Sequence, residues 1–177
     1  IGYKVVVLDP NENAPAVQIA DEIILGDFDD EIALIKLAQK TKVITYEFEH
    51  INTELLLKLE NDNYKIYPSA ATLKKIQNKR IQKNFFKNNG IAIPLFYEIE
   101  SMDDLKTALK SFNKKGVVKA CTGGYDGKGT VLIKNIDEIN LEKIYQSCKS
   151  QEIILEELVN FKKEVSIIVA KNANEIE

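Results

Sequence analysis

A glycine-rich segment between two apolar runs constrains the fold of this chain more than any other feature. The flanking runs, residues 117–120 and 130–134, contain β-branched residues, and the loop between them includes four glycines. This pattern predicts two strands joined by a loop. Glycine backbones adopt positive φ, so that N–H groups can surround an anion, while Lys119 and Lys128 supply positive charge. The segment predicts a phosphate-binding hairpin; an ordinary hairpin tip is the alternative, because Asp-Gly at 126–127 is also a common tight turn.

The loop matches neither of the two standard phosphate-binding motifs. A P-loop requires Gly-x-x-x-x-Gly-Lys-Ser/Thr, which is absent from the sequence. A Rossmann turn leads into a helix, whereas this loop leads into a strand. We therefore expect the hairpin to act as a flap that closes over its ligand.

The sequence before residue 71 alternates between strand and helix patterns. We expect strands at 4–8, 22–25, 43–48 and 65–67, and helices from about residue 16 and at 29–40 and 53–59. Such alternation is typical of a parallel sheet that is covered by helices. Ligands of these sheets bind beyond the carboxyl ends of the strands, which makes Asp9 and the segment 46–50 candidate binding positions.

Two acidic residues, Glu47 and Glu49, lie at the end of the strand expected at 43–48. Strand alternation places both side chains on one face with Thr45. Neighbouring carboxylates are unfavourable unless a ligand, a cation or solvent meets them, so a substrate contact and a solvated edge are both open interpretations. His50, the only histidine, is by itself more typical of a structural hydrogen bond than of catalysis.

The rest of the chain predicts a second unit that begins after about residue 71. Ser69 is a helix-capping residue and Gly90 a helix stop, so we expect one long helix between them. The residues expected on its inner face are Leu73, Ile76, Phe85 and Phe86, and those on its solvent face are Gln77, Asn78, Lys79, Arg80 and Lys83. Further strands are expected at 96–99, 153–156 and 164–170, and further helices at 102–111 and 141–147.

Composition limits the class of protein. With 177 residues, 45% of them hydrophobic and 29% charged, the chain can bury an ordinary core in one domain or two small ones. A net charge of −3 without a basic stripe argues against extended nucleic-acid binding. Two isolated cysteines and one histidine form neither a disulfide framework nor a zinc site, and they suit a reducing cytoplasm. No apolar run approaches the roughly 20 residues that span a bilayer, so no membrane partner is expected.

Several segments together resemble the ATP-grasp enzymes. They are Gly-Tyr-Asp-Gly-Lys-Gly at 124–129, Ile-Leu-Glu-Glu-Leu-Val at 154–159 and the run 161–170. Three further segments are similar to the branch of that family that carboxylates aminoimidazole ribonucleotide in purine biosynthesis: Val-Leu-Asp-Pro at 7–10, the segment 45–50 and Ile-Gln-Asn-Lys at 76–79.

The fold that this resemblance implies is α/β. A Rossmann-like pre-ATP-grasp domain with a parallel sheet, residues 1–71, would precede the first part of an ATP-grasp domain at 72–177. The second domain would contain a helix and strand lobe at 72–115 and a glycine-flap lobe at 116–177.

The resemblance also implies where a nucleotide binds. ATP, accompanied by Mg²⁺, would lie between the two lobes, with Lys79 and Lys119 at its phosphates and the loop closing over them. The segment 156–159 would meet the adenine and Glu164 the ribose, while Glu47, or in second place Glu49, would contact the substrate. The full set of implied nucleotide contacts is Lys79, Lys119, Gly124, Tyr125, Asp126, Gly127, Lys128, Gly129, Thr130, Glu156, Glu157, Leu158, Val159 and Glu164.

In one motif the sequence departs from the family pattern at two positions, 78 and 79. The usual Gln-Asp-Arg reads Gln77-Asn78-Lys79 here. Lysine keeps the positive charge of arginine but loses its bidentate geometry. Lys79 and its neighbour Arg80 are therefore both candidates for the nucleotide contact.

The activity that the resemblance implies is carboxylation of aminoimidazole ribonucleotide by bicarbonate, driven by ATP cleavage and passing through carboxyphosphate. Another ATP-grasp ligase and a nucleotide-binding piece without catalysis are the alternatives. Members of the family usually have a strand and a glycine-rich turn before the position of Ile1, and magnesium and substrate ligands beyond that of Glu177. We therefore expect the metal site outside this chain, no activity from the chain alone, and a homodimer for the full-length protein.

Overall fold

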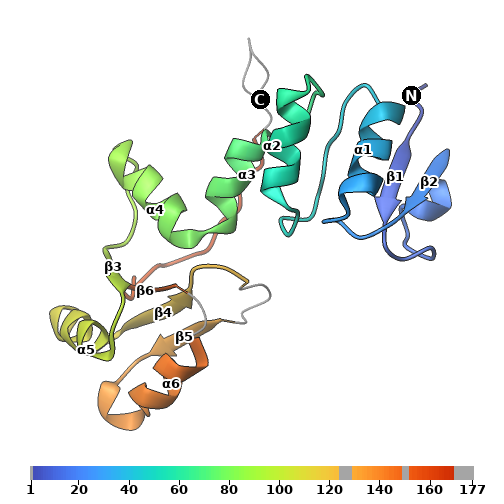
Figure 1. The fold of residues 1–177 in the computed structure, drawn as a ribbon. Helices are drawn as coiled ribbons and strands as arrows, with labels where there is room; N and C mark the ends of the chain where they lie inside the picture. Colours follow the sequence, from blue (N-terminus) through green and yellow to red (C-terminus); the bar gives the residue numbers. More distant parts are fainter. Residues whose placement is uncertain (1, 124–128, 149–151, 170–177) are drawn as a thin grey trace.

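The structure is a computed structural model that describes residues 2–123, 129–148 and 152–169 (Figure 1). Its elements in chain order are β1 (Val6–Asp9), the 3-10 turn η1 (Val17–Ile19), β2 (Glu22–Leu25), α1 (Glu31–Lys40), α2 (Thr53–Asn61), α3 (Ala70–Gln77), α4 (Lys79–Asn88), β3 (Phe96–Ile99), α5 (Met102–Ser111), β4 (Gly116–Ala120), β5 (Thr130–Ile133), the 3-10 turn η2 (Ile136–Glu138), α6 (Leu141–Cys148) and β6 (Ile153–Glu156). Within the described ranges, no helix is both long and apolar enough to cross a membrane.

The first part of the chain is a small parallel α/β unit. Strands β1 and β2 pair in parallel from Val6 opposite Glu22 to Asp9 opposite Leu25. Asp30 caps the start of helix α1, and its side chain accepts hydrogen bonds from the amides of Ile32 and Ala33. Helices α1, α2 and α3 bury Leu34, Leu56 and Leu73, among others, in one core with Ile24 of β2. The predicted α/β class is confirmed.

Three predicted elements of this unit are wrong in type. Residues 17–19 form a 3-10 turn, and the two predicted strands at 43–48 and 65–67 contribute only an isolated parallel bridge between Ile44 and Ile66. The free edge of β1 and the segment 44–48 line a largely apolar cavity of about 480 Å³. A strand needs a hydrogen-bonding neighbour along its length, and in the described part of the chain the segment 43–48 has one at Ile44 alone.

The second part is built on a four-stranded antiparallel sheet in the order β3-β6-β4-β5. Val118 lies opposite Leu155, and both point into a core with Leu105 and Leu109 of α5. Strands β4 and β6 approach closely at Gly116, where an added Cβ would lie 2.8 Å from the Leu155 side chain and 3.0 Å from the Glu156 carbonyl oxygen. Alternation places Lys119 and Glu156 on the opposite face of the sheet from this core.

The single helix predicted between Ser69 and Gly90 is wrong, because the chain leaves the helical conformation at Asn78. There φ is −122° and ψ is 112°, and the side-chain oxygen accepts hydrogen bonds from the amides of Arg80 and Ile81. Asn78 therefore ends α3 and caps α4, and the two helices meet at an angle (Figure 1). The helix was predicted from the periodicity of its hydrophobic residues. A break made by one capping side chain leaves that periodicity unchanged, so the pattern did not reveal it.

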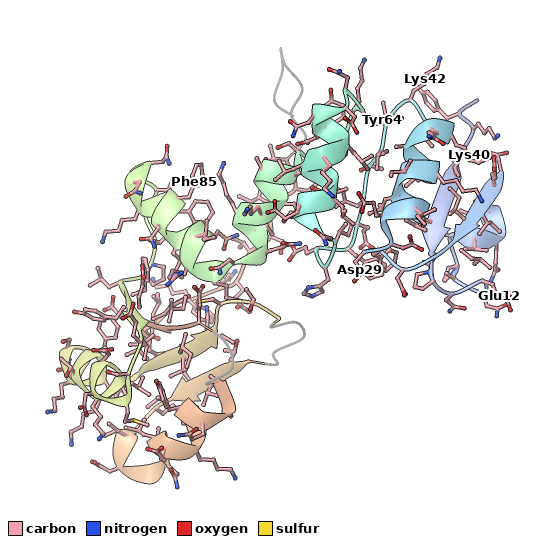
Figure 2. The ribbon with its side chains drawn as sticks, in the orientation of Figure 1. Glu12, Asp29, Lys40, Lys42, Tyr64 and Phe85 are labelled. Carbon is pink, nitrogen blue, oxygen red and sulfur yellow. The ribbon has the colours of Figure 1, made fainter. Side chains whose placement is uncertain are left out.

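Helix α4 packs on the sheet through its polar face, contrary to the prediction. None of its residues is buried, and Phe85, expected on the inner face, is 40% exposed. Figure 2 shows Phe85 on the side of α4 that faces away from the sheet. Arg80, Lys83 and Asn84 instead contact carboxylates on β3, on β6 and just before β6. Leu73 of α3 is buried, as predicted.

The predicted strand at 164–170 does not form over its described part. After β6 the chain runs to residue 169 without regular secondary structure. Val165, Ile167 and Ile168 are each more than three-quarters exposed. Their β-branched pattern is that of a strand, but in the described ranges no neighbouring segment pairs with it.

Candidate functional site

The face of the antiparallel sheet beneath α4 carries a buried charge cluster. Lys119 Nζ, from β4, donates a hydrogen bond to Glu156 Oε2, from β6, at 2.8 Å. Lys83 Nζ, from α4, lies 3.1 Å from Glu156 Oε1. Glu156 is only 5% exposed. The Lys83–Glu156–Lys119 cluster thus holds one carboxylate between two ammonium groups that come from separate elements.

Charge balance explains why this carboxylate can be buried. An unpaired buried carboxylate costs several kcal/mol, roughly, because water no longer solvates it. Two cations offset that cost and leave the cluster with a formal charge of +1. Within the described residues Oε1 accepts no hydrogen bond, although Lys83 Nζ is within ion-pair distance. The contact with Lys83 is therefore electrostatic, whereas the contact with Lys119 is also a hydrogen bond.

A second set of contacts fixes α4 on the sheet. Arg80 forms ion pairs with Glu152 and, at 3.7 Å, with Glu98. Asn78 Nδ2 donates to Glu152 Oε2 at 2.8 Å, and Asn84 Nδ2 donates to Glu98 Oε1 at 2.8 Å. The guanidinium of Arg80 is therefore engaged by two carboxylates in this structure.

The first residue of α4 lies at the start of the glycine loop. The amide of Lys79 donates to the carbonyl oxygen of Cys121 at 2.9 Å, and the amide of Cys121 donates to the carbonyl oxygen of Glu152 at 2.7 Å. The side chain of Lys79 forms no ion pair or hydrogen bond with the parts of the chain that are described. Burial raises the pKa of the Cys121 thiol, which keeps it protonated at neutral pH. Of the two candidate cations, Arg80 is held by carboxylates, whereas Lys79 has no ion pair among the described residues.

The glycine loop is described only at its two ends. Gly123 and Gly129 have φ of +66° and +74°, a region that favours glycine. The amide of Ala120 donates to the carbonyl oxygen of Gly129 at 2.7 Å, which closes the base of the hairpin before β5 begins at Thr130. The predicted contacts at Gly124, Tyr125, Asp126, Gly127 and Lys128 lie outside the described residues.

The residues predicted to meet adenine and ribose follow the charge cluster directly. Glu157, Leu158 and Val159 continue from β6 and are exposed, and the amide of Glu157 donates to the carbonyl oxygen of Leu95 at 2.8 Å. Glu164 is also exposed. The structure thus brings Lys119, Glu156 and the segment 157–159 together, while no described contact joins Glu164 to them.

A cavity of about 690 Å³ contains residues from both parts of the chain. Its lining residues are Asp27, Phe28, Asp29, His50, Ile51, Asn52, Gln77, Thr122 and Gly123. The side chain of Gln77 donates to the carbonyl oxygens of Glu49 and Ile51 at 2.6 and 2.7 Å, so it ties the segment 49–51 to the end of α3. Glu47 and Glu49 are exposed and do not line this cavity. Glu47 lines instead the cavity beside β1.

Three residues of the cavity and the charge cluster were not predicted as site residues from the sequence. Asp27 and Asp29 follow the carboxyl end of β2, and the strand-end rule applied to Asp9 would have found them. Lys83 stands three residues after Arg80 and four before Lys87, the spacing of one helix face. That spacing could have indicated a shared face, although nothing in it reveals a buried partner.

The described residues do not form a magnesium site. They contain no group of three His, Cys, Asp or Glu side chains placed to hold a metal ion. The best-placed carboxylate, Glu156, is already neutralised by two lysines.

Comparison with known proteins identifies two adjacent domains. The ATP-grasp domain family matches residues 84–176, more than half of the chain, and the ribonucleotide synthetase preATP-grasp domain family matches residues 1–77. The N5-carboxyaminoimidazole ribonucleotide synthase of Staphylococcus aureus strain COL is 38% identical over 174 residues, which are 98% of this chain and 46% of that protein.

Two crystal structures have the same arrangement. The N5-carboxyaminoimidazole synthetase of Staphylococcus aureus complexed with ADP has a TM-score of 0.91 and 38% identity, and the match covers 99% of this chain and 46% of that one. The N5-carboxyaminoimidazole ribonucleotide synthetase of Thermotoga maritima has a TM-score of 0.86 and 38% identity, and the match covers 99% of this chain and 45% of that one. The chain spans about half the length of these relatives, and it belongs to the ATP-grasp family.

Proposed function

We propose that the native protein carrying this sequence is an ATP-dependent ligase. It carboxylates 5-aminoimidazole ribonucleotide with bicarbonate, in purine biosynthesis, and gives N5-carboxyaminoimidazole ribonucleotide, ADP and phosphate. The 38% identity to the Staphylococcus aureus synthase over 98% of this chain supports this reaction. The structural observation that carries the proposal is the cluster of net positive charge at the base of the glycine loop, where Lys119 immediately precedes Ala120 and Cys121.

The nucleotide would lie against the polar face of the antiparallel sheet. Lys119 and Lys79 would contact its phosphates, with Gly129 and Thr130 at the edge of the loop that covers them. The exposed segment 157–159 would offer backbone groups to the adenine, and Glu164 would accept from a ribose hydroxyl. Charge-assisted contacts of this kind are the main means by which a protein assists phosphoryl transfer.

Chemistry then proceeds in two steps. A bicarbonate oxygen attacks the γ-phosphorus of ATP, which releases ADP and forms carboxyphosphate. The exocyclic amine of the substrate attacks the carboxyl carbon, and phosphate leaves as the amine loses a proton. The cavity of about 690 Å³ has the volume of a small-molecule site, and it joins the segment 50–52 to the start of the loop. Glu47 or Glu49 would contact the substrate from the neighbouring segment.

Three further properties belong to this proposal. Magnesium would neutralise charge on the β- and γ-phosphates, with ligands other than the residues described here. A cytoplasmic location is supported by Cys121 and Cys148, which are free thiols. The native protein is proposed to be a homodimer, which its mass in solution would test. The domain boundary at 71–72 remains a prediction.

Calorimetric titration with ATP tests the nucleotide site. Lys119→Ala is expected to bind ATP at least tenfold more weakly than wild type, a loss of about 1.4 kcal/mol or more. Lys110→Ala removes an exposed lysine of α5, on the other side of the sheet, and is the matched control. Equal affinities of wild type and Lys119→Ala would contradict the proposed phosphate contact.

The reaction itself is tested on the native protein. Phosphate release from ATP should depend on both bicarbonate and aminoimidazole ribonucleotide. Release that needs neither compound, or release with a different amine acceptor only, would rule out this substrate while leaving the nucleotide site intact.

A further inference from the structure

We infer that Lys83 is a positioning residue for the nucleotide site. It compensates the negative charge of Glu156, so that the ammonium group of Lys119 is available to the phosphates of the nucleotide. This inference rests on the proposed function. It concerns a residue that has no direct contact with the nucleotide in that proposal. The observation behind it is that a single buried carboxylate is shared by Lys83 on α4 and Lys119 on β4.

The two lysines are not equivalent. The Lys83 side chain is 12% exposed and that of Lys119 is 28% exposed, so an incoming anion can reach Lys119 more easily. Lys119 also lies next to the end of β4, where the glycine loop begins, whereas Lys83 is on the face of α4 that packs on the sheet. Lys83 Nζ lies 5.7 Å from the centre of the Phe96 ring, and Phe96 is the β3 residue opposite Glu156. The ammonium group of Lys83 therefore lies close to both the Glu156 carboxylate and the Phe96 ring.

The role of Lys83 follows from a competition between the Glu156 carboxylate and the nucleotide phosphates for the ammonium group of Lys119. A carboxylate and a phosphate are both anions that seek the same ammonium group. If Lys119 were the only partner of Glu156, the pair would be neutral, and an anionic ligand would face a buried carboxylate of like charge. With Lys83 present, the carboxylate keeps one cation and the positive charge of Lys119 remains for the ligand. Removal of Lys83 should therefore weaken binding of phosphates and leave binding of the nucleoside part almost unchanged.

Lys87 provides a matched control on the same helix. It lies one turn after Lys83, and its Nζ is 6.0 Å from the centre of the same Phe96 ring. It is exposed, and it forms no ion pair with a carboxylate in the described ranges. A substitution at Lys87 removes the same charge from the same helix without changing the partners of Glu156.

The test is a double-mutant cycle read by calorimetry with ATP and, separately, adenosine. Lys83→Met is expected to lose at least tenfold in affinity for ATP and less than twofold for adenosine. Lys87→Met should stay within twofold of wild type for both ligands. In a Glu156→Gln background there is no carboxylate charge to hold, so the same Lys83→Met change should cost less than threefold.

The outcomes separate the inference from the proposed function. Failure of the wild-type chain to bind ATP would overturn the nucleotide site itself. A tenfold loss for Lys119→Ala together with unchanged ATP affinity for Lys83→Met would overturn the inference alone. An equal loss for ATP and adenosine, with no relief from Glu156→Gln, would show that Lys83 only holds α4 in place, and would also overturn it.

A measurement on the wild-type protein covers the case in which Lys83→Met does not fold. Nitrogen-labelled lysine side chains are followed by NMR during titration with ATP, and Lys83→Arg, which keeps the charge, assists assignment. The Lys119 ammonium signal is expected to shift on saturation, while the Lys83 ammonium stays protected from exchange by its ion pair. Loss of that protection at saturating ATP would contradict the inference.

Discussion

Asn78 performs three structural tasks, one through its backbone and two through its side chain. Its extended backbone ends α3, its Oδ1 caps α4, and its Nδ2 donates to Glu152 Oε2. A side-chain amide can accept from two backbone N–H groups through its oxygen while it donates to a carboxylate through its nitrogen. The aspartate that the family resemblance leads one to expect at this position could make the cap but could not donate to Glu152.

Substitution of Asn78 should separate these tasks. Asn78→Ala removes the cap and is expected to lower the free energy of unfolding by about 1 kcal/mol or more. Asn78→Asp keeps the cap but sets a second carboxylate against Glu152, so it should destabilise the protein at neutral pH and recover as acid protonates one of the pair. Urea unfolding at neutral and acidic pH measures both effects. An Asp variant as stable as wild type at neutral pH would show that the bond to Glu152 contributes nothing.

Helix α5 shows at the scale of one element how local sequence sets a boundary. Ser101 Oγ accepts from the amide of Asp104 at 3.1 Å, and Asp104 Oδ2 accepts from the amide of Ser101 at 2.8 Å. These bonds form a capping box. The pKa of Asp104 is lowered below its usual value, chiefly by the side chain of Ser101 and further by the backbone amides of Glu100 and Ser101. Both partners lie within four residues, so this boundary was predictable.

The capping box predicts a specific pH dependence. The pKa of Asp104 is lower in the folded than in the unfolded protein, so its contribution to stability is present above the unfolded pKa and disappears as pH falls through the folded one. Asp104→Ala should therefore destabilise the protein at neutral pH and match wild type once the carboxyl is protonated in both states. Thermal unfolding at several pH values measures this. Asp103→Ala removes a carboxyl of the same helical turn that is not part of the capping box, and it is the control; a pH-independent difference would refute the account.

How well the sequence predicted each element depended on where its partners lie. Helices α1, α2 and α5 have local caps and periodic apolar faces, and they were predicted closely. The segments 43–48 and 164–169 have strand composition, but a strand also needs neighbours, and sequence pattern does not report those. In the site, the glycine loop and Lys119 came from a local pattern. Lys83 did not, because its partner Glu156 is distant in the chain and reaches it only through tertiary packing.

At the scale of the whole molecule, the described residues form two hydrophobic cores that share no residue. One is formed by β1, β2 and helices α1 to α3, and includes Leu56 and Leu73. The other lies between the antiparallel sheet and helices α5 and α6, and includes Leu105 and Leu155. Helices α3 and α4 connect them through the polar contacts of Asn78 and Arg80. Polar contacts of this kind couple the unfolding of two units less strongly than a shared hydrophobic core does.

Separate cores should give separate unfolding transitions. Leu56→Ala and Leu105→Ala each remove a side chain that is almost wholly buried, and each is expected to cost about 2–5 kcal/mol. Differential scanning calorimetry should show Leu56→Ala lowering the melting temperature of one transition and Leu105→Ala that of the other. A single transition that both variants shift equally would mean that the two cores unfold as one unit.

The order of the antiparallel sheet also governs how the chain can fold while it is being made. Strand β6 lies between β3 and β4, yet it is the last of the four strands in the sequence. Ribosomes add roughly 5–20 residues per second, so β3 and β4 exist for a few seconds before β6 is complete. During that interval Lys83 and Lys119 have been synthesised but Glu156 has not. The last of these four strands to leave the ribosome therefore both completes the sheet and reduces the positive charge beneath α4.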